Sequence, residues 1–522
     1  MPNSTRSVRI LLTASEAYPA LERAFLGAVS EIWASFLVFD LSTRLRSPEA
    51  LAIGKTWFDL VVHTLNRGVS LHFSISDFDP IARAVLHRGA TRQLRMFSAA
   101  AAVANPGAKL QVIRARHPAE TGVLVRLAIW PYIMKKLFRT TGWLNGLSPD
   151  HRAAALRDMD GAAQNMHLRA NGTVAPRLWS LPRLFPAVHH QKLAVIDRRI
   201  LYIGGLDLDE RRYDTPNHRR AGNQTWHDVQ LMIEGPVVAE AQQHLQTFHD
   251  VIDGRLAPPK TRRLFRTLSR PRRDSLWHFG PDPLVSELRS AHLILSRRAR
   301  NFIYLESQYF RDSGLAKALA ETARRTPALQ MILILPAAPD DVAFDRKRGL
   351  DARFGEAMQA RALRILRKGF GSRLFVGSPA QPRPALPDGE TDGDPSERRD
   401  RLHGAPLIYV HAKVSVFDDT SAIVSSANLN GRSLRWDTEA GVYLTKENDV
   451  IELRHRVMAH WLPADVGREA FDAATAVRAW TRIAWHNAAK SPADREGYLL
   501  PHDFAAAEAF GRNLPILPAE FV

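Results

Sequence analysis

The sequence predicts an α/β fold with largely buried sheets. Short apolar stretches with strand character alternate with stretches whose apolar residues are spaced as on a helix, and the second half of the chain repeats the order of the first. Alternation of this kind is typical of α/β domains whose sheets are covered on both faces. At 522 residues the chain is long enough for two or three domains, each with its own core.

The first half mixes helical and strand signals. Residues 21–41 carry apolar side chains at helical spacing, and a short strand follows Gly68 in GVSLHFSISDFD. A β-rich stretch covers 188–205. After it we expect a strand in WHDVQLMIEGPVV and a helix in AEAQQHLQTFHDVI.

The second half shows the same alternation. We expect helices over 284–297 and over 315–323, followed by strands in NFIYLESQYF and in LQMILILPAA respectively. A continuous apolar run such as the last one indicates a strand that is buried on both faces of its sheet.

Segments without apolar periodicity divide the chain. Residues 255–273 hold eight basic residues, three prolines and no acid, which favours an interdomain connector over a dedicated phosphate-binding element. Residues 378–404 are rich in Pro, Gly, Asp and Arg, so a mobile loop is expected there. The repeated pattern ends near Pro463, and the rest is expected to pack on the second domain.

These divisions predict four segments. Two are domains, one joins them, and one extends the second domain. They are an N-terminal domain at 1–254, a basic linker at 255–274, a C-terminal domain at 275–465 and a C-terminal extension at 466–522.

Composition narrows the range of partners. A net charge of +17 and a pI near 10.4 favour polyanions, namely nucleic acid, anionic lipid or phosphorylated small molecules. The hydrophobic content of 45% is ordinary for a soluble globular protein. The chain has no cysteine, so disulfides and thiolate metal sites are excluded.

The sequence predicts neither a signal peptide nor a spanning helix. The N-terminus lacks an uninterrupted apolar core, and no stretch reaches the roughly 18 apolar residues that a spanning helix needs. The nearest, 123–143, is interrupted by charged residues and favours a buried or half-buried helix over a cationic membrane-surface segment. We therefore expect a monomer that is cytoplasmic or peripheral at the membrane; export without a classical signal peptide stays open.

The strongest signal is an internal repeat. The stretch HHQKLAVIDRRILYIGGLDLDER aligns without a gap with VHAKVSVFDDTSAIVSSANLNGR. A constant offset of 221 positions, the difference between 411 and 190, relates the two copies. The paired residues are His190 and His411, Lys192 and Lys413, Asp197 and Asp418, Gly205 and Ser426, and Asp207 and Asn428. Two ungapped copies of His-x-Lys-x4-Asp argue against chance.

Strand geometry separates the members of the motif. Residues two apart on a strand point the same way, so each histidine shares a face with the lysine that follows it. Asp197 lies at an odd spacing from His190, and DRR is typical of the turn into the next strand; Asp418 is placed in the same way. We therefore expect both aspartates to stabilise hairpins and each His–Lys pair to be reactive.

The residue types of the pairs indicate phosphate chemistry. Burying a lysine beside a histidine is costly unless an anion completes the site. A phosphate accepts the lysine charge, while two imidazoles can supply a nucleophile or base and an acid, as a two-step phosphoryl-type displacement requires. Metal ligation is disfavoured because each lysine would repel a divalent cation. The remaining alternative is a set of ordinary residues duplicated with the fold.

Further residues are expected to support the pairs. An imidazole that must hold one tautomer needs a partner on its other nitrogen. Asp228 and Glu439 are the predicted orienting carboxylates, with Asp228 expected to hold His190; the alternative is an ordinary surface acid for each. Small residues would let the backbone approach the phosphate. The predicted phosphate-binding positions are Gly205, Asp207, Ser426 and Asn428, next to Gly204 and Ser425.

These motifs resemble the phospholipase D superfamily. The flanking segments YIGGLDLDERRYD, WHDVQLMIEGPVV and FIYLESQYF are similar to segments of phospholipase D enzymes themselves. The resemblance covers about 21–462 and is weakest at 105–182 and 378–404. It implies two α-β-α-β-α domains related by pseudo-twofold symmetry, with one active site at their interface.

The resemblance also implies a mechanism. It implies chemistry through a covalent phosphohistidine without a metal or other cofactor. His190 would be the nucleophile, and His411 would protonate the leaving alcohol and then activate water or an acceptor alcohol. Asp207 stands where many members have Asn, so its contact with the phosphate is less well supported than that of Asn428.

The expected function is that of a phospholipase D. It would hydrolyse a glycerophospholipid at a membrane surface to phosphatidic acid and an alcohol, with transphosphatidylation. The alternatives are a phosphatidyltransferase of the cardiolipin-synthase type, a nuclease of the same superfamily, which the charge would suit, and a non-catalytic scaffold. The sequence does not indicate the headgroup.

Overall fold

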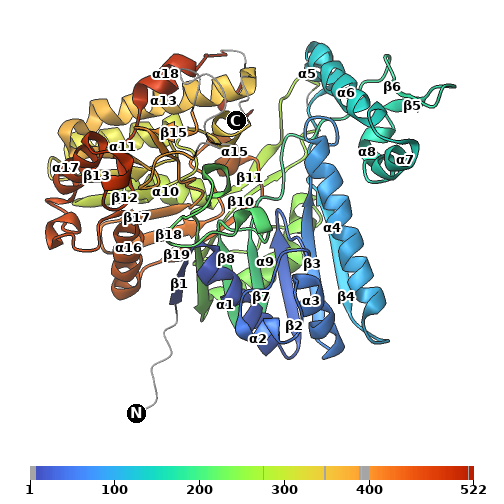
Figure 1. Ribbon diagram of the computed structural model, residues 1–522, viewed down its shortest axis with the longest axis horizontal. Helices are drawn as coiled ribbons and strands as arrows, with labels where there is room; N and C mark the ends of the chain where they lie inside the picture. Colours follow the sequence, from blue (N-terminus) through green and yellow to red (C-terminus); the bar gives the residue numbers. More distant parts are fainter. Residues whose placement is uncertain are drawn as a thin grey trace.

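The computed structural model describes residues 8–273, 276–345, 349–386, 390, 399–514 and 517–521. Within these residues the strands form two large sheets, each with its own helices (Figure 1). The first sheet has the strand order β1-β9-β8-β7-β2-β3-β4, and the second has the order β11-β10-β19-β18-β17-β12-β13-β14-β20. The α/β class is therefore confirmed.

The first lobe contains the first sheet. Its strands are β1 (Val8–Leu12), β2 (Glu31–Phe36), β3 (Ser70–Asp77), β4 (Leu110–Arg116), β7 (Leu193–Ile196), β8 (Ile200–Gly204) and β9 (Val229–Glu234). One face packs on α1 (Thr13–Gly27), α3 (Trp57–Asn66) and α4 (Ala84–Val103). The other face shares a core with α9 (Val237–Ile252) and with the second lobe.

The second lobe contains the second sheet. Its strands are β10 (Leu264–Arg270), β11 (Asp282–Ser286), β12 (Phe302–Glu306), β13 (Gln330–Ile334), β14 (Leu374–Pro379), β17 (Val414–Phe417), β18 (Ser421–Ser425), β19 (Glu439–Leu444) and β20 (Leu499–Pro501). Its main helices are α10 (Glu287–Arg298), α11 (Ser313–Arg325), α13 (Leu350–Phe370), α16 (Glu447–Trp461), α17 (Ala476–Ala489) and α18 (Phe504–Phe510).

The two sheets contain the same six-strand unit. The order β9-β8-β7-β2-β3-β4 in the first matches β19-β18-β17-β12-β13-β14 in the second. In each unit the last three strands are parallel to one another, and the motif strand, β7 or β17, is antiparallel to its neighbours. The sequence repeat is therefore a repeat of the fold, as the pseudo-twofold prediction requires.

The structure differs from the expected elements in two places. The predicted helix over 21–41 is wrong, because α1 ends at Gly27 and β2 follows; the apolar residues of a buried strand continued the helical spacing by coincidence. The expected linker contains β10, which pairs with β19, so these residues belong to the second sheet. The basic composition of this segment suggested a solvated linker, but Arg266 is buried in the second lobe and paired with Glu287.

The C-terminal extension is part of the second lobe. Its strand β20 pairs with β14 at the edge of the second sheet, and α18 lies against α13. This agrees with the expected packing on the second domain. Of the mobile loop expected at 378–404, residues 387–389 and 391–398 lie outside those described, while the described part includes the short strand β15 (Arg401–Leu402).

Asp197 and Asp418 both occupy turns with a positive φ of 52°. The Asp197 carboxylate accepts hydrogen bonds from the backbone N–H groups of residues 29–31, at the start of β2. The Asp418 carboxylate accepts from the N–H groups of residues 300–302, at the start of β12. The structural role predicted for both aspartates is thus supported by matching contacts in the two lobes.

Replacing either aspartate should reduce stability and spare catalysis. Asp197→Ala and Asp418→Ala each leave three backbone donors without their acceptor, so we expect the free energy of unfolding in urea to fall by about 2–4 kcal/mol. Asp→Asn is the matched control, because it keeps an acceptor and tolerates positive φ. A folded variant that loses turnover 100-fold would instead assign the aspartate to the site.

A helical insertion separates β4 from β7. It contains α5 (Val123–Ala128), α6 (Trp130–Asn145), α7 (Pro149–Arg157) and α8 (Asp160–Ala163), with its own small core. Figure 1 shows it standing apart from the two sheets. The half-buried helix predicted here is confirmed in two pieces, since Ile133 and Leu137 are buried while Leu127 and Phe138 are about half exposed. Among the described residues, no helix combines the length and apolar character needed to cross a membrane.

Candidate active site

The two His–Lys pairs lie on the segments that lead into β7 and β17. His190 and Lys192 directly precede β7, and His411 and Lys413 directly precede β17. In each copy the lysine ammonium donates to the carbonyl of its own histidine, at 2.6 Å for Lys192. The two copies are therefore built alike.

Backbone hydrogen bonds carry each motif segment across to the other lobe. The N–H of His190 donates to the carbonyl of Thr438 at 2.8 Å, and the N–H of Thr438 donates to the carbonyl of Val188 at 2.9 Å. In the same way, the N–H of His411 donates to His227 at 2.8 Å. The first motif therefore lies beside Thr438, which precedes Glu439 of the second lobe. The second motif lies beside His227, which precedes Asp228 of the first lobe.

The carboxylates are consequently exchanged between the lobes. His190 Nδ1 contacts Glu439 at 3.0 Å, and His411 Nδ1 contacts Asp228 at 2.6 Å. Both acids are partners of the histidines, as expected, but the expectation that Asp228 holds His190 is wrong. The physical reason is the pair of interlobe bridges, which the sequence does not reveal.

This pairing exposes one nitrogen of each ring. A carboxylate on Nδ1 favours the tautomer with the proton on Nδ1, which leaves the lone pair on Nε2. The imidazole of His190 is 14% exposed and that of His411 is 5% exposed. Burial lowers the pKa of His190, although Glu439 opposes the shift, and burial together with Lys413 lowers the pKa of His411 strongly. A pKa below the usual imidazole value favours the neutral form of both rings at neutral pH.

Cations converge on the same place. Burial lowers the pKa of Lys192 to about 7, and burial likewise lowers the pKa of Lys413 to about 7. Arg212 is a third cation of the site: it pairs with Asp207, and its charge disfavours protonation of Lys192 and Lys413. Sequence reasoning missed Arg212, because only its neighbour Arg211 falls on the repeat.

The predicted phosphate-binding positions serve different purposes in the two lobes. A Cβ on Gly205 would lie 2.2 Å from Oδ1 of Asp228, so glycine is needed there to admit the carboxylate. At the equivalent position the hydroxyl of Ser426 donates to Glu439. The two residues thus accommodate the orienting acids.

Asp207 and Asn428 also differ. Asp207 accepts from the N–H of Val38 at 2.9 Å and lies 3.4 Å from the Lys192 ammonium, so it balances the cations. Asn428 donates to Gln308 at 3.1 Å, and its buried Oδ1 has no partner among the described residues. Asn428 therefore keeps free hydrogen-bonding capacity at the position where the resemblance expects a phosphate contact.

An aromatic side chain that the sequence did not single out completes the site. The ring of Trp226 lies 4.6 Å from that of His411, and the Arg212 guanidinium lies 5.2 Å from the Trp226 ring centre. Trp226 precedes Asp228 by two residues within TWHDVQL. This position beside a predicted orienting carboxylate is the sequence signal that could have identified Trp226.

Oxyanion binding should be linked to proton uptake. An anion favours charged lysines and raises a pKa that burial holds near 7, so affinity should fall as the pH rises above 7. Titration calorimetry with tungstate at pH 8, in two buffers of different ionisation enthalpy, should detect uptake that decreases in Lys192→Met and Lys413→Met. A heat independent of the buffer would contradict this linkage.

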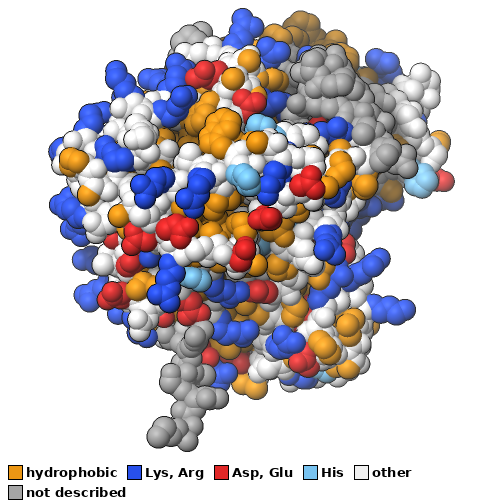
Figure 2. All heavy atoms as spheres, turned by 60° about the vertical axis from the view of Figure 1, so that its left-hand side comes forward, with side chains coloured by type: hydrophobic (Ala, Val, Ile, Leu, Met, Phe, Trp, Pro, Cys, Tyr) orange, Lys and Arg blue, Asp and Glu red, His pale blue; other side chains and the backbone are white. Residues whose placement is uncertain are grey.

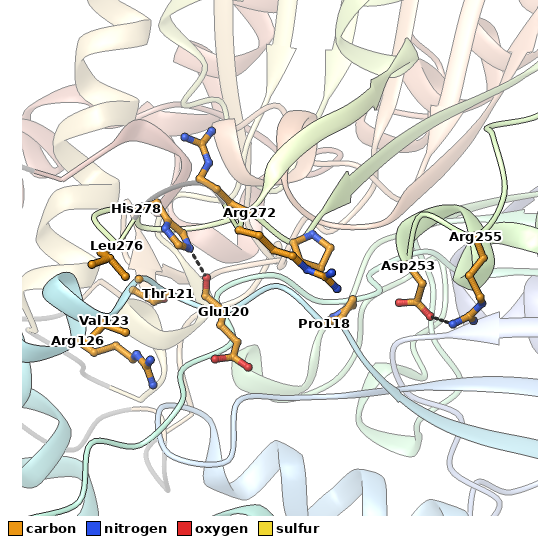
Figure 3. Close-up of a pocket in the computed structure, with 13 residues that line it drawn as sticks. Pro118, Glu120, Thr121, Val123, Arg126, Asp253, Arg255, Arg272, Leu276 and His278 are labelled. Atoms are coloured by element: carbon orange, nitrogen blue, oxygen red, sulfur yellow. Dashed lines mark hydrogen bonds and ion pairs between the residues drawn. The ribbon is translucent and has the colours of Figure 1, made fainter.

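A separate cavity of about 440 Å³ lies between the start of the insertion and the segment that joins the lobes (Figure 3). Its wall includes Arg126, and an ion pair at 2.8 Å joins Arg255 to Asp253 there. None of the predicted site residues lines this cavity. The motif residues, and not this cavity, therefore define the candidate active site.

Comparison with known proteins agrees with the motifs. No family model matches the chain. The chain is 24% identical over 358 residues to phospholipase D alpha 1 of Oryza sativa subsp. japonica, covering 47% of this chain and 44% of that protein. It is 23% identical over 337 residues to phospholipase D1 of Schizosaccharomyces pombe, covering 47% of this chain and 24% of that protein.

The chain resembles phospholipase D enzymes in sequence. The resemblance expected from the two His-x-Lys-x4-Asp copies is thereby confirmed. The matched part is less than half the length of these phospholipase D relatives.

Two solved structures are also similar. Phosphatidylserine synthase of Haemophilus influenzae matches with a TM-score of 0.47 and 11% identity, covering 86% of this chain and 85% of that one. Polyphosphate kinase of Porphyromonas gingivalis matches with a TM-score of 0.42 and 10% identity, covering 87% of this chain and 50% of that one.

Proposed function

We propose that this protein is a phospholipase D-type phosphodiesterase that hydrolyses glycerophospholipids to phosphatidic acid and a free alcohol. The observation that carries the proposal is the pair of neutral histidines, each held at Nδ1 by a carboxylate of the opposite lobe. Such a pair supplies one nucleophile and one proton carrier to a single phosphodiester.

In the first step His190 is the nucleophile. Its Nε2 lone pair forms the N–P bond while the bond from phosphorus to the leaving alcohol breaks. His411 takes up a proton at Nε2 when the anionic substrate binds, and it gives this proton to that alcohol. Lys192 and Lys413 stabilise the charge on the non-bridging oxygens, and the anionic substrate opposes the effect of burial on the pKa of His411.

The second step reverses the roles at phosphorus. His411, now neutral, accepts a proton from water as the water oxygen attacks phosphorus, and the N–P bond breaks to restore His190. An alcohol in place of water gives transphosphatidylation, because any hydroxyl that reaches the phosphohistidine can accept the phosphatidyl group.

The helical insertion carries a surface that suits a lipid substrate. Strand β7 runs antiparallel to β2, β3 and β4. The C-terminal end of β4, where the insertion starts, therefore lies at the same edge of the sheet as the start of β7. The chain returns from the insertion to this edge just before His189. Residues 121–149 of the insertion include Lys135, Lys136 and Arg139 but no acid. Leu127, Phe138 and Trp143 are exposed among them. Apolar and basic side chains together suit an anionic membrane surface.

The alternatives differ in substrate. A phosphatidyltransferase of the cardiolipin-synthase type would use the same intermediate with a lipid alcohol as acceptor. A nuclease would suit the net charge of +17. On the face shown in Figure 2, however, Lys and Arg side chains lie scattered with Asp and Glu among them, whereas nucleic-acid-binding proteins concentrate basic residues in a patch or stripe.

One assay tests the proposal against these alternatives. Purified protein is incubated with phosphatidylcholine and phosphatidylethanolamine vesicles and a primary alcohol, with and without EDTA, and separately with DNA. We expect phosphatidic acid and the phosphatidyl alcohol from the vesicles. DNA cleavage without either lipid product would overturn the lipid proposal, and phosphatidyl transfer to another lipid without phosphatidic acid would favour the transferase.

A further inference from the structure

Three histidines that the proposed mechanism does not use gather beside the active site. His218 and His227 come from the first lobe, and His460 comes from the last turn of α16 in the second. One ring nitrogen of each residue lies within 4.8 Å of the ring nitrogens of the other two. His460 is far from His218 and His227 in sequence, so the lobe interface brings it to them.

Buried carboxylates already hold two of the three rings. His218 Nδ1 lies 2.7 Å from Asp214, and His227 Nε2 lies 3.2 Å from Glu306. Each acid occupies one ring nitrogen and leaves the other, His218 Nε2 and His227 Nδ1, with its lone pair. Histidines that bind metal ions are held in this way, with a carboxylate or carbonyl on the nitrogen opposite the metal.

The carboxylates are themselves fixed by other donors. Asp214 accepts from the backbone N–H of Trp226 at 2.7 Å. Glu306 accepts from the indole of Trp461 at 2.8 Å and from the hydroxyl of Tyr304. A metal site needs such outer partners to orient its ligands, and both His218 and His227 have them.

The facing nitrogens lack sufficient partners of their own. His218 Nε2 and His460 Nε2 lie 2.9 Å apart, so a single hydrogen bond with one proton between them is the interaction that these two nitrogens share. His227 Nδ1 is buried and has no partner among the described residues. Buried polar atoms are normally hydrogen-bonded, and an orphan calls for an explanation such as an ion.

We propose that His218, His227 and His460 bind a divalent transition-metal ion, for which Zn²⁺ is the best match. Three imidazole nitrogens with an open fourth position are typical of zinc. At Zn–N distances of about 2.0–2.1 Å the ligand nitrogens are roughly 3.3 Å apart, so a small opening of the His218–His460 pair admits the ion. His460 is partly exposed, which leaves a route from solvent.

The ion would tie the lobes together at the active site. His227 precedes Asp228, which holds His411, and the carbonyl of His227 accepts from the N–H of His411. His460 joins this segment to α16. The three histidines act as positioning residues, and the inference is independent of the lipid proposal because metal content is measured without turnover.

Metal binding by tag-free protein tests the inference. After dialysis against a chelator and then buffer, wild type should bind one equivalent of Zn²⁺ by mass spectrometry, show visible absorption of tetrahedral Co²⁺, and melt at a higher temperature with Zn²⁺ than without. His460→Gln and His218→Gln should each weaken binding by more than about 100-fold, and Asp214→Asn by about 10–100-fold, as expected for an outer partner.

Matched variants exclude other binding sites. His455 lies on the same helix as His460 but outside the cluster, and His190 is an active-site imidazole. The variants His455→Gln and His190→Ala should therefore bind Zn²⁺ as wild type does. Circular dichroism checks that each variant folds. Wild type without a bound equivalent, or His460→Gln and His218→Gln that bind like wild type, would overturn the inference.

Discussion

A stoichiometric burst of p-nitrophenol, followed by almost no turnover, is the expected result when His411→Ala is mixed with phosphatidyl-p-nitrophenol. This leaving group departs without a proton, so His190 can form the phosphohistidine unaided. The second step then lacks its base, and steady-state turnover should fall by about 10⁴-fold, the upper range for loss of a general acid–base group. Stopped-flow absorbance measures both phases.

The opposite variant should give no burst. His190→Ala removes the proposed nucleophile, so neither phase should appear. Exposed His167→Ala is a control for loss of an imidazole outside the site. A burst from His190→Ala together with none from His411→Ala would reverse the assignment of the two histidines.

Isosteric amides at the two carboxylates should reproduce these phenotypes across the lobes. Asp228 contacts His411 and Glu439 contacts His190. Asp228→Asn should therefore keep the burst and slow the second phase, whereas Glu439→Gln should slow the burst itself. A loss of about 10²–10⁴-fold in the affected phase is expected, because the imidazole loses its tautomer and its counter-charge.

The two amide variants control for each other. They make the same chemical change at symmetry-related positions, so a general loss of stability would affect both phases in both variants. If Asp228→Asn slowed the burst and Glu439→Gln slowed only the second phase, each acid would serve the histidine of its own half, and the exchange between lobes would be contradicted.

Much of the fold could be predicted because its units are local. Apolar alternation predicted the buried strands around both motifs, and the repeat predicted that the two halves fold alike. The failures occurred where a long-range contact decided the outcome. The segment of β10 is basic but becomes a strand because it pairs with β19, and β20 is too short to recognise without its partner β14.

The sequence by itself determined which residues carry the proposed chemistry. The chain contains two copies of His-x-Lys in register, each followed by small residues and then by an acid or an amide. This pattern is recognised from the sequence without any interatomic distance. The turn role of Asp197 and Asp418 followed from the same periodicity, because side-chain direction alternates along a strand.

Only the tertiary structure decided which carboxylate serves which histidine. Spacing along the chain suggested Asp228 for His190, but backbone hydrogen bonds at Thr438 and His227 carry each motif segment into the opposite lobe. The same interface brings His460 to His218 and His227. Such pairings depend on how the two sheets pack against each other. The free energy of this packing comes from burial of a shared apolar core, which no local sequence pattern specifies.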